Sequence, residues 1–127
     1  MRMKLMTAVA VAAGLMATGA LAQDPKTAGE YRQSLQRMID DTGGGECPAD
    51  LMAEGLLNAC REQIDQMAMG IASLGAVTEM RLVEVRGEGA ERVEIYDVDF
   101  QHGVTLRWGI GHQVDGKFST AYAGRGE

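Results

Sequence analysis

Two aspartates stand at a spacing that suggests acid–base chemistry. Asp97 and Asp99 lie two apart in a segment of alternating residues, which in a strand places both carboxylates on one face, about 7 Å apart. Carboxylates at that separation can share acid–base work. The same alternation puts the pair opposite the apolar residues, so we expect two solvated carboxylates and no catalytic residue here.

His102 and His112 are the only histidines of the sequence. We predict His102 at the tip of a hairpin and His112 about 30 Å away along the next strand, too far apart to share a metal ion within one chain. We therefore predict no metal site and no cofactor. His102 is interpreted as an exposed loop residue. His112 shares a face with Trp108 and Ile110, so a position at the rim of a pocket is its functional interpretation.

Cys47 and Cys60 are the only cysteines, and we predict a structural disulfide between them. A redox pair is the alternative, but twelve residues intervene where oxidoreductase motifs have two. A straight helix from Cys47 to Cys60 would separate them by about 20 Å, whereas a disulfide needs Cα atoms within about 7 Å. The segment from Cys47 to Met52 must therefore fold back along a helix that starts near Ala53.

The first 22 residues have the features of a cleaved signal peptide. A basic start and an apolar run from Leu5 to Ala13 precede Ala20-Leu21-Ala22, a pattern that signal peptidases recognise. We predict cleavage between Ala22 and Gln23, which leaves residues 23–127 as one exported domain, either periplasmic or secreted. The apolar run is shorter than the roughly 20 residues of a membrane span, so we expect no stable membrane insertion after cleavage.

The charge balance argues against nucleic acid as a partner. Loss of Arg2 and Lys4 with the presequence changes the formal net charge from −6 to −8. Such an acidic chain repels phosphates and anionic headgroups. The sequence also has no G-x-S-x-G or H-E-x-x-H motif, no phosphate-binding loop and no dinucleotide motif. The absence of these motifs weakens the case for an enzyme.

Two helices are predicted in the first part of the exported domain. Asp24-Pro25 is a helix-start signal, and apolar residues at helical spacing extend this helix from Pro25 to about Asp41, before Gly43-Gly44-Gly45. A second apolar stripe, with steps of three and four, begins near Ala53 and closes near Gly75.

From Val77 onward the apolar period changes to two, which is typical of strands. We predict four of them, separated by glycine-containing turns: Met80 to Arg86, Val93 to Gln101, Val104 to Gly111 and Lys117 to Ala123. The sequence therefore predicts an α+β fold, in which two helices precede a curved four-stranded antiparallel meander and a helix packs in its concavity.

The pairing of the middle hairpin follows from its apolar residues. A three-residue loop, Gln101 to Gly103, pairs Tyr96 with Trp108 and Val98 with Leu106, and keeps the apolar side chains on one face. It also places Gly103 in the left-handed conformation that such loops need. We predict this loop.

The last turn, Asp115-Gly116, leaves two arrangements open. A two-residue loop sends Phe118 and Tyr122 to the face of Gly109 and Gly111, where aromatic rings would cover strand glycines. A bulge is the alternative.

Several short motifs occur in an order that adds a resemblance: Leu51-Met52-Ala53-Glu54-Gly55-Leu56, Ser73-Leu74-Gly75, Tyr96-x-Val98-x-Phe100-x-x-Gly103, Trp108 and Asp115-Gly116-Lys117. Over roughly Ala49 to Ala121 this order resembles the α+β roll of cystatin-like and nuclear-transport-factor-two-like domains. In particular, it resembles the small module found beside secreted bacterial serine hydrolases and α/β-hydrolases. The resemblance implies a non-catalytic accessory domain or a roll that accommodates a ligand; Cys47 and Cys60 are an addition to its pattern.

The candidate pocket residues share one predicted face: Tyr96, Val98, Trp108, Ile110 and His112. We expect an exported accessory or binding domain without catalysis of its own. It would hold a small apolar ligand in the roll, or bind an envelope protein on the outer sheet face, where a homodimer is also an option. The alternative function is a small lyase- or isomerase-like enzyme that uses a carboxylate or His112. A structural or inhibitory envelope protein is a third interpretation. Core packing is the alternative role for Tyr96 and Trp108.

Overall fold

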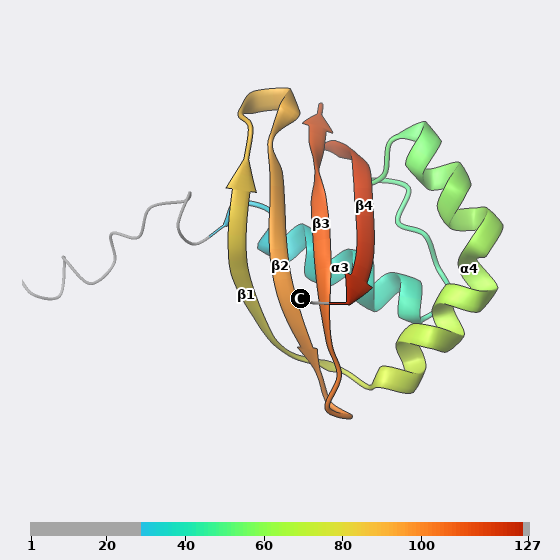
Figure 1. Ribbon diagram of the computed structural model, residues 1–127. Helices are drawn as coiled ribbons and strands as arrows, with labels where there is room; N and C mark the ends of the chain where they lie inside the picture. Colours follow the sequence, from blue (N-terminus) through green and yellow to red (C-terminus); the bar gives the residue numbers. More distant parts are fainter. Residues whose placement is uncertain (1–28, 126–127) are drawn as a thin grey trace, which may run out of the picture.

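Two helices precede a four-stranded antiparallel sheet in the computed structural model, which describes residues 29–125 (Figure 1). The strand order β1-β2-β3-β4 follows the chain, so the sheet is an open meander and the predicted α+β class is confirmed. In Figure 1, α3 crosses behind the sheet and α4 runs alongside β4. The bounds are α3 Arg32–Gly43, α4 Glu54–Leu74, β1 Val77–Arg86, the short 3₁₀ turn η2 Gly89–Glu91, β2 Val93–Phe100, β3 Thr105–Val114 and β4 Lys117–Arg125.

The first helix starts later than predicted. We expected it from Pro25, but Gly29 has a φ of 89° and the helix begins at Arg32. The Glu94 carboxylate accepts hydrogen bonds from the backbone N–H groups of Glu30 and Tyr31, at 2.8 and 2.9 Å, and holds a bend before the helix. The Asp24-Pro25 start signal and the Ala22–Gln23 cleavage site lie outside the described residues.

The segment between the helices folds back as predicted. Cys47 and Cys60 form a disulfide with Cα atoms 6.1 Å apart, which confirms the predicted bridge. Met52 forms a parallel bridge with Phe118 of β4, because the Ala53 N–H donates to the Phe118 carbonyl and the Phe118 N–H donates to the Leu51 carbonyl, both at 2.8 Å. The loop is therefore attached to the sheet edge on one side and to α4 on the other.

The second helix confirms its predicted bounds. It spans Glu54–Leu74 and is followed by Gly75, whose φ of 85° ends the helix. Among the described residues, no helix combines the length and the apolar character that a membrane crossing requires.

The middle hairpin has the predicted register. Tyr96 pairs with Trp108 and Val98 with Leu106. Gly103 adopts a φ of 92°, and its N–H donates to the Phe100 carbonyl across the loop. A single apolar face on β2 and β3 results, and it packs toward the helices.

The last hairpin has the two-residue loop, one of the two arrangements that the sequence left open, and its pairing runs without a bulge. Its loop is the two residues Asp115 and Gly116, with φ values of 52° and 82°. Tyr122 covers Gly109 as expected, since a Cβ there would lie 2.3 Å from the Tyr122 ring.

Phe118 does not lie on the face of Gly109 and Gly111 beside Tyr122, contrary to the expectation for a two-residue loop. It is completely buried among the core residues, and its ring meets Tyr31 edge-on at 4.9 Å. Ile110 pairs with Ala121 and Phe118 pairs with Gln113, so the strand register predicts that the two side chains lie on opposite faces of the sheet. Both side chains nevertheless reach the core, because the regular alternation of side chains changes near His112, whose φ is 58°.

The disulfide should contribute substantially to stability, because it closes a short loop between two elements. We expect the double variant Cys47→Ser/Cys60→Ser to unfold with a free energy about 2–5 kcal/mol lower than the wild type. Urea denaturation followed by circular dichroism measures this difference. A thiol reductant should lower the wild-type midpoint to that of the variant and leave the variant unchanged. Equal midpoints for the oxidised wild type and the variant would contradict a stabilising bridge.

Candidate functional site: an apolar cavity beside α4

A cavity of about 580 Å³ lies between α4, α3 and the β3–β4 side of the sheet. Most of its wall is apolar. The wall residues are Leu35, Met38, Thr42, Met52, Leu56, Ala59, Cys60, Gln63, Met67, Gly70, Ile71, Leu74, Leu106, Trp108, Ala121, Tyr122 and Ala123. A volume of this size lies within the usual range for small-molecule sites.

The cavity exists because α4 does not pack closely on the sheet. Of its 21 residues, Cys60 alone is buried, although the helix carries a continuous apolar stripe. Small residues line the space between α4 and the sheet. Ala121 and Ala123 come from β4, and Gly70 comes from α4, where an added Cβ would meet no atom within 4 Å. The apolar stripe of α4 thus lines an unfilled space.

Over residues 29–125, the cavity wall carries no carboxylate, imidazole, amine or guanidinium group. Among the described residues that line it there is no aspartate, glutamate, histidine, lysine or arginine. Its polar side chains are Thr42, Gln63, Trp108 and Tyr122. The Trp108 Nε1 atom is buried without a hydrogen-bond partner, and no other buried side-chain nitrogen or oxygen of the described residues shares that property. A lone buried donor is unusual in a folded protein.

The predicted pocket residues divide between the cavity and the core. Trp108 lies on the cavity wall. Tyr96, Val98 and Ile110 are completely buried in the core cluster. His112 lies outside the cavity wall, and its Nδ1 atom is hydrogen-bonded to the Thr120 hydroxyl. The structure therefore brings Trp108, but not the other four residues, to the cavity.

A buried ion pair, absent from our sequence prediction, lies on the same inner face. Glu94 is completely buried, and its carboxylate accepts hydrogen bonds from Arg92 Nη2 and the Tyr96 hydroxyl, both at 2.6 Å. Burial by itself would raise the pKa of Glu94. The hydrogen bonds from Tyr96, from the Tyr31 and Glu30 amides and from Arg92 together outweigh burial and hold this pKa below its usual value. Glu94 is therefore ionised and fully engaged in linking β2 to the start of α3.

Burial and the hydrogen bond to ionised Glu94 raise the pKa of Tyr96, so this phenol remains protonated and acts as a donor. The sequence contained a signal for this network. Glu94 has the same strand parity as the inward-facing Tyr96 and Val98, and Arg92 stands two residues before it. An acidic residue at an inward position needs a cationic partner.

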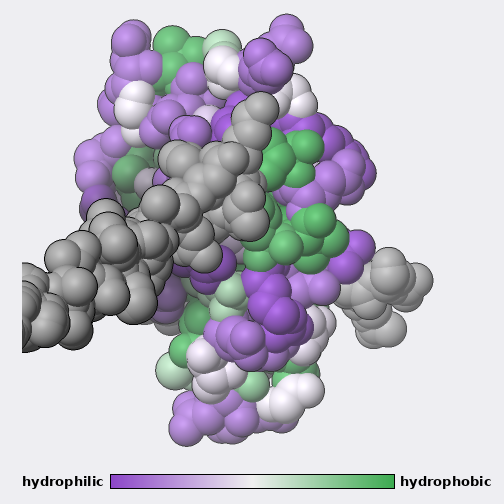
Figure 2. Space-filling view, turned by 90° about the vertical axis from the view of Figure 1, so that its left-hand side faces the viewer, coloured by the Kyte–Doolittle hydropathy of each residue, from purple (hydrophilic) through white to green (hydrophobic). Residues whose placement is uncertain are grey.

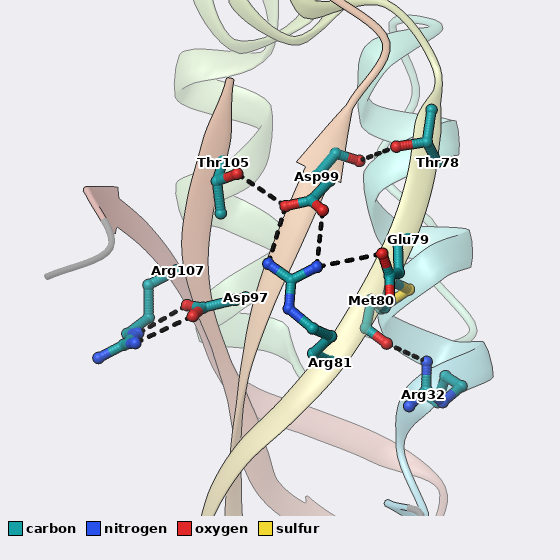
Figure 3. A network of polar contacts seen from close by, with 9 residues as sticks. All are labelled: Arg32, Thr78, Glu79, Met80, Arg81, Asp97, Asp99, Thr105 and Arg107. Carbon is teal, nitrogen blue, oxygen red and sulfur yellow. Dashed lines mark hydrogen bonds and ion pairs between the residues drawn. The ribbon is translucent and has the colours of Figure 1, made fainter. Parts of the chain in front are cut away.

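The two aspartates lie on the outer face of the sheet, as Figure 3 shows. Asp99 receives two hydrogen bonds from Arg81, at 2.6 and 3.0 Å, and Asp97 is paired with Arg107 at 2.8 Å. The bonds from Arg81 and Thr105 lower the pKa of Asp99 to about 2. The bond from Arg107 likewise lowers the pKa of Asp97. Both groups stay ionised and lack the raised pKa that a general acid needs.

His102 lies at the exposed hairpin tip and contacts the end of α4. Its Nδ1 atom is 2.9 Å from the Ser73 carbonyl oxygen, and its backbone N–H donates to the Leu74 carbonyl at 3.0 Å. Within residues 29–125, no cluster of three or more histidine, cysteine, aspartate or glutamate residues has the geometry of a metal site.

On the part of the β1 side that Figure 2 leaves visible, hydrophilic residues predominate, with apolar areas between them. Comparisons with protein-family models, with curated proteins and with solved structures found no match for this chain. The resemblance to cystatin-like and nuclear-transport-factor-two-like rolls therefore stays a prediction.

Removal of the Tyr96 hydroxyl should destabilise the protein. We expect Tyr96→Phe to lower the free energy of unfolding by about 1.5–3 kcal/mol, because a buried hydrogen bond to an ionised group is lost. Tyr122→Phe is the matched control, since Tyr122 is 49% exposed, and it should leave the urea midpoint unchanged. Equal midpoints for the two variants would show that the Glu94 network does not depend on Tyr96.

The lowered pKa of Glu94 also predicts acid sensitivity. Its ionised form stabilises the folded state above the usual value of 4.5, and this contribution is lost as the pH falls through the lower folded pKa. Glu94→Gln should cost about 3–5 kcal/mol at neutral pH, because buried Arg92 loses its short ion pair and keeps the longer one, at 3.7 Å, to half-exposed Glu30.

Urea denaturation from pH 7 downward measures this effect. The gap in unfolding free energy between the wild type and Glu94→Gln should narrow below pH 4.5. Other carboxylates titrate in both proteins and cancel in the difference. Parallel curves at all pH values would contradict a lowered pKa.

Proposed function

We propose that this protein is an exported, non-catalytic binding domain that accommodates a small apolar ligand in the cavity beside α4. The observation that carries the proposal is the cavity itself, which holds about 580 Å³ within a mainly apolar wall. A space of this kind is what an apolar ligand needs, because its surface leaves water on binding.

The distribution of charge supports binding over catalysis. The buried carboxylate of Glu94 is consumed by Arg92, Tyr96 and two backbone amides. The outer-face aspartates are engaged by arginines. Among the described residues, the wall of the cavity offers no aspartate, glutamate, histidine, lysine or arginine for proton transfer, and Tyr122 is the ionisable side chain that lines it.

The disulfide supports a location outside the cytoplasm, since such bonds persist in oxidising compartments. Together with the signal-peptide pattern of residues 1–22, it favours the periplasm or the extracellular medium. The cystatin-like roll architecture is part of this proposal, because rolls of that kind accommodate ligands between a helix and a sheet.

Filling the cavity tests the function directly. The neutral fluorophore phenylnaphthylamine should bind the exported domain, and Trp108, the only tryptophan of the sequence, should report its arrival by a change in emission. Ala121→Leu should weaken binding by roughly 15- to 60-fold, because the larger side chain displaces two or three methylene-sized contacts at about 0.8 kcal/mol each.

Ala72→Leu is the matched control. Ala72 is exposed on α4, outside the wall of this cavity, so affinity should not change. Circular dichroism and thermal melting establish that both variants fold. Equal loss of binding in both variants, or no binding by the wild type, would contradict the assignment of this cavity as the site.

A further inference from the structure

The chain itself already adds an extended segment to the outer edge of β4. The Phe118 N–H donates to the Leu51 carbonyl, and the Phe118 carbonyl accepts from the Ala53 N–H, both at 2.8 Å. Met52 thereby forms a parallel bridge with Phe118. The pairing stops at Ala53 because α4 begins at Glu54 and takes the chain out of the line of the strand. This edge therefore accepts a strand, and the protein supplies one only for its first part.

The remaining part of the β4 edge has backbone groups without a partner. Backbone groups of alternate residues point to the same side of a strand, so Thr120, Tyr122 and Gly124 direct theirs to the edge that Phe118 uses. In residues 29–125, none of these three N–H and three C=O groups takes part in a hydrogen bond beyond the strand. They form a row of about 13 Å, and Tyr122 and Gly124 are exposed. Another extended backbone supplies the matching row of acceptors and donors.

The opposite edge of the sheet is protected against such pairing. β1 has register shifts between Val77 and Glu79 and between Leu82 and Glu84, and its exposed positions include glutamates and arginines. Irregular pairing and charged side chains are the usual means by which edge strands avoid a further strand. β4 pairs with β3 without a shift, and Thr120–Gly124 contains neither a charged residue nor a proline. Of the two edges, β4 is the one left open to a partner.

The side chains around this edge favour an apolar partner. Ala121, Tyr122 and Ala123 belong to the wall of the cavity, and Met67 and Leu74 belong to it on the α4 side. Ala121 and Ala123 have small side chains, so a strand beside them can turn every second side chain towards the apolar wall. No described residue of that wall carries a charge. The side chains that point there are therefore apolar.

A single strand suits this edge better than a second copy of the whole domain. A second copy would bring the other strands of its sheet with its own β4. In Figure 1, α4 lies beyond the β4 edge, where that second sheet would have to continue. A lone extended segment needs only the usual strand spacing of about 4.8 Å beside β4.

We propose that the edge Thr120–Gly124 binds an extended segment of a partner polypeptide, which adds a fifth strand to the sheet and carries an apolar residue at every second position. The β4 backbone supplies the hydrogen bonds, and the neighbouring cavity wall selects the alternate side chains. This inference goes beyond the proposed function, because it adds a polypeptide partner. It depends on the edge of β4 and not on a small ligand in the cavity.

Fluorescence anisotropy of a labelled peptide tests the inference on the full exported domain. The probe is the fluorescein-labelled peptide KTVTVTVK, and it should bind saturably. The peptide KTSTSTSK has the same charge and length but lacks the apolar residues, and it should bind at least about tenfold more weakly. Equal affinities, or no binding of the valine peptide, would overturn the inference.

The phenylnaphthylamine measurement keeps the two proposals apart. Fluorophore binding without peptide binding would overturn this inference and support the proposed function. Peptide binding without fluorophore binding would support this inference and overturn the proposed function.

Two N-methylated isomers of the valine peptide test recognition through the backbone. One isomer carries methyl groups on its three valine nitrogens, and the other carries them on its three threonine nitrogens. Because alternate N–H groups of a strand face one edge, only one isomer loses its hydrogen bonds to β4. That isomer should bind about fiftyfold more weakly than the other. Equal affinities of the two isomers would overturn pairing with the β4 edge.

Tyr122→Pro tests the same pairing from the side of the protein. Proline is tolerated on an edge strand but removes the N–H group that faces the partner, so peptide binding should weaken by about fivefold or more. Tyr122→Ala is the matched control, because it also loses the ring but keeps the N–H. Circular dichroism and thermal melting establish that both variants fold. Equal affinities of the two folded variants would overturn the inference.

Gly124→Pro and Gly124→Ala form a second pair for the case in which Tyr122→Pro does not fold, since a Cβ added at Gly124 would meet no atom within 4 Å. The same difference in peptide affinity is expected, and equal affinities would again contradict the assignment. Size-exclusion chromatography tests the other occupant. A wild-type dimer that the proline variant dissociates and the alanine variant retains would assign the edge to a second copy and overturn the peptide partner.

Discussion

The attachment of α4 at its two ends is the constraint on which the site depends. At its start, the Cys47–Cys60 disulfide and the backbone bonds between Ala53 and Phe118 tie the helix and its preceding loop to the sheet edge. At its end, the hairpin tip holds Leu74 through the His102 N–H. These contacts are covalent or directional, so they fix where the ends lie. The middle of the helix cannot settle onto the sheet without disrupting them, and the space beneath it stays open.

The buried ion pair fixes the start of α3 against the sheet. Glu94 joins β2 to the bend before α3, and Arg92 lies 5.6 Å from the centre of the Tyr31 ring. Because two charges without water need every hydrogen bond that they can make, this network tolerates little movement of α3. The helix that forms part of the cavity wall is thereby held against the sheet. The domain thus keeps its buried charges in one place and its apolar cavity in another, a separation that suits binding better than proton transfer.

Much of the fold was predictable because it follows from local patterns. The α4 stripe, the Gly75 stop, the disulfide fold-back and the middle hairpin register each depend on residues close together in sequence or on one pairing rule. The predicted start of α3 was wrong because Glu94, more than sixty residues away in the sequence, imposes the bend at Glu30 and Tyr31. The predicted face of Phe118 was wrong because His112 interrupts the regular alternation of side chains along β3.

The amino-acid sequence alone determined which elements form, which residues share a face and which cysteines pair, since these follow from periodicity, turn chemistry and chain geometry. It placed Trp108 beside Tyr96 and grouped both as candidates for a pocket. Only the tertiary structure decided that Tyr96 belongs to a buried polar network while Trp108 borders an open space. The reason is physical: whether an inward-facing side chain meets a neighbour or a void depends on how far α4 lies from the sheet, and contacts distant in sequence set that separation.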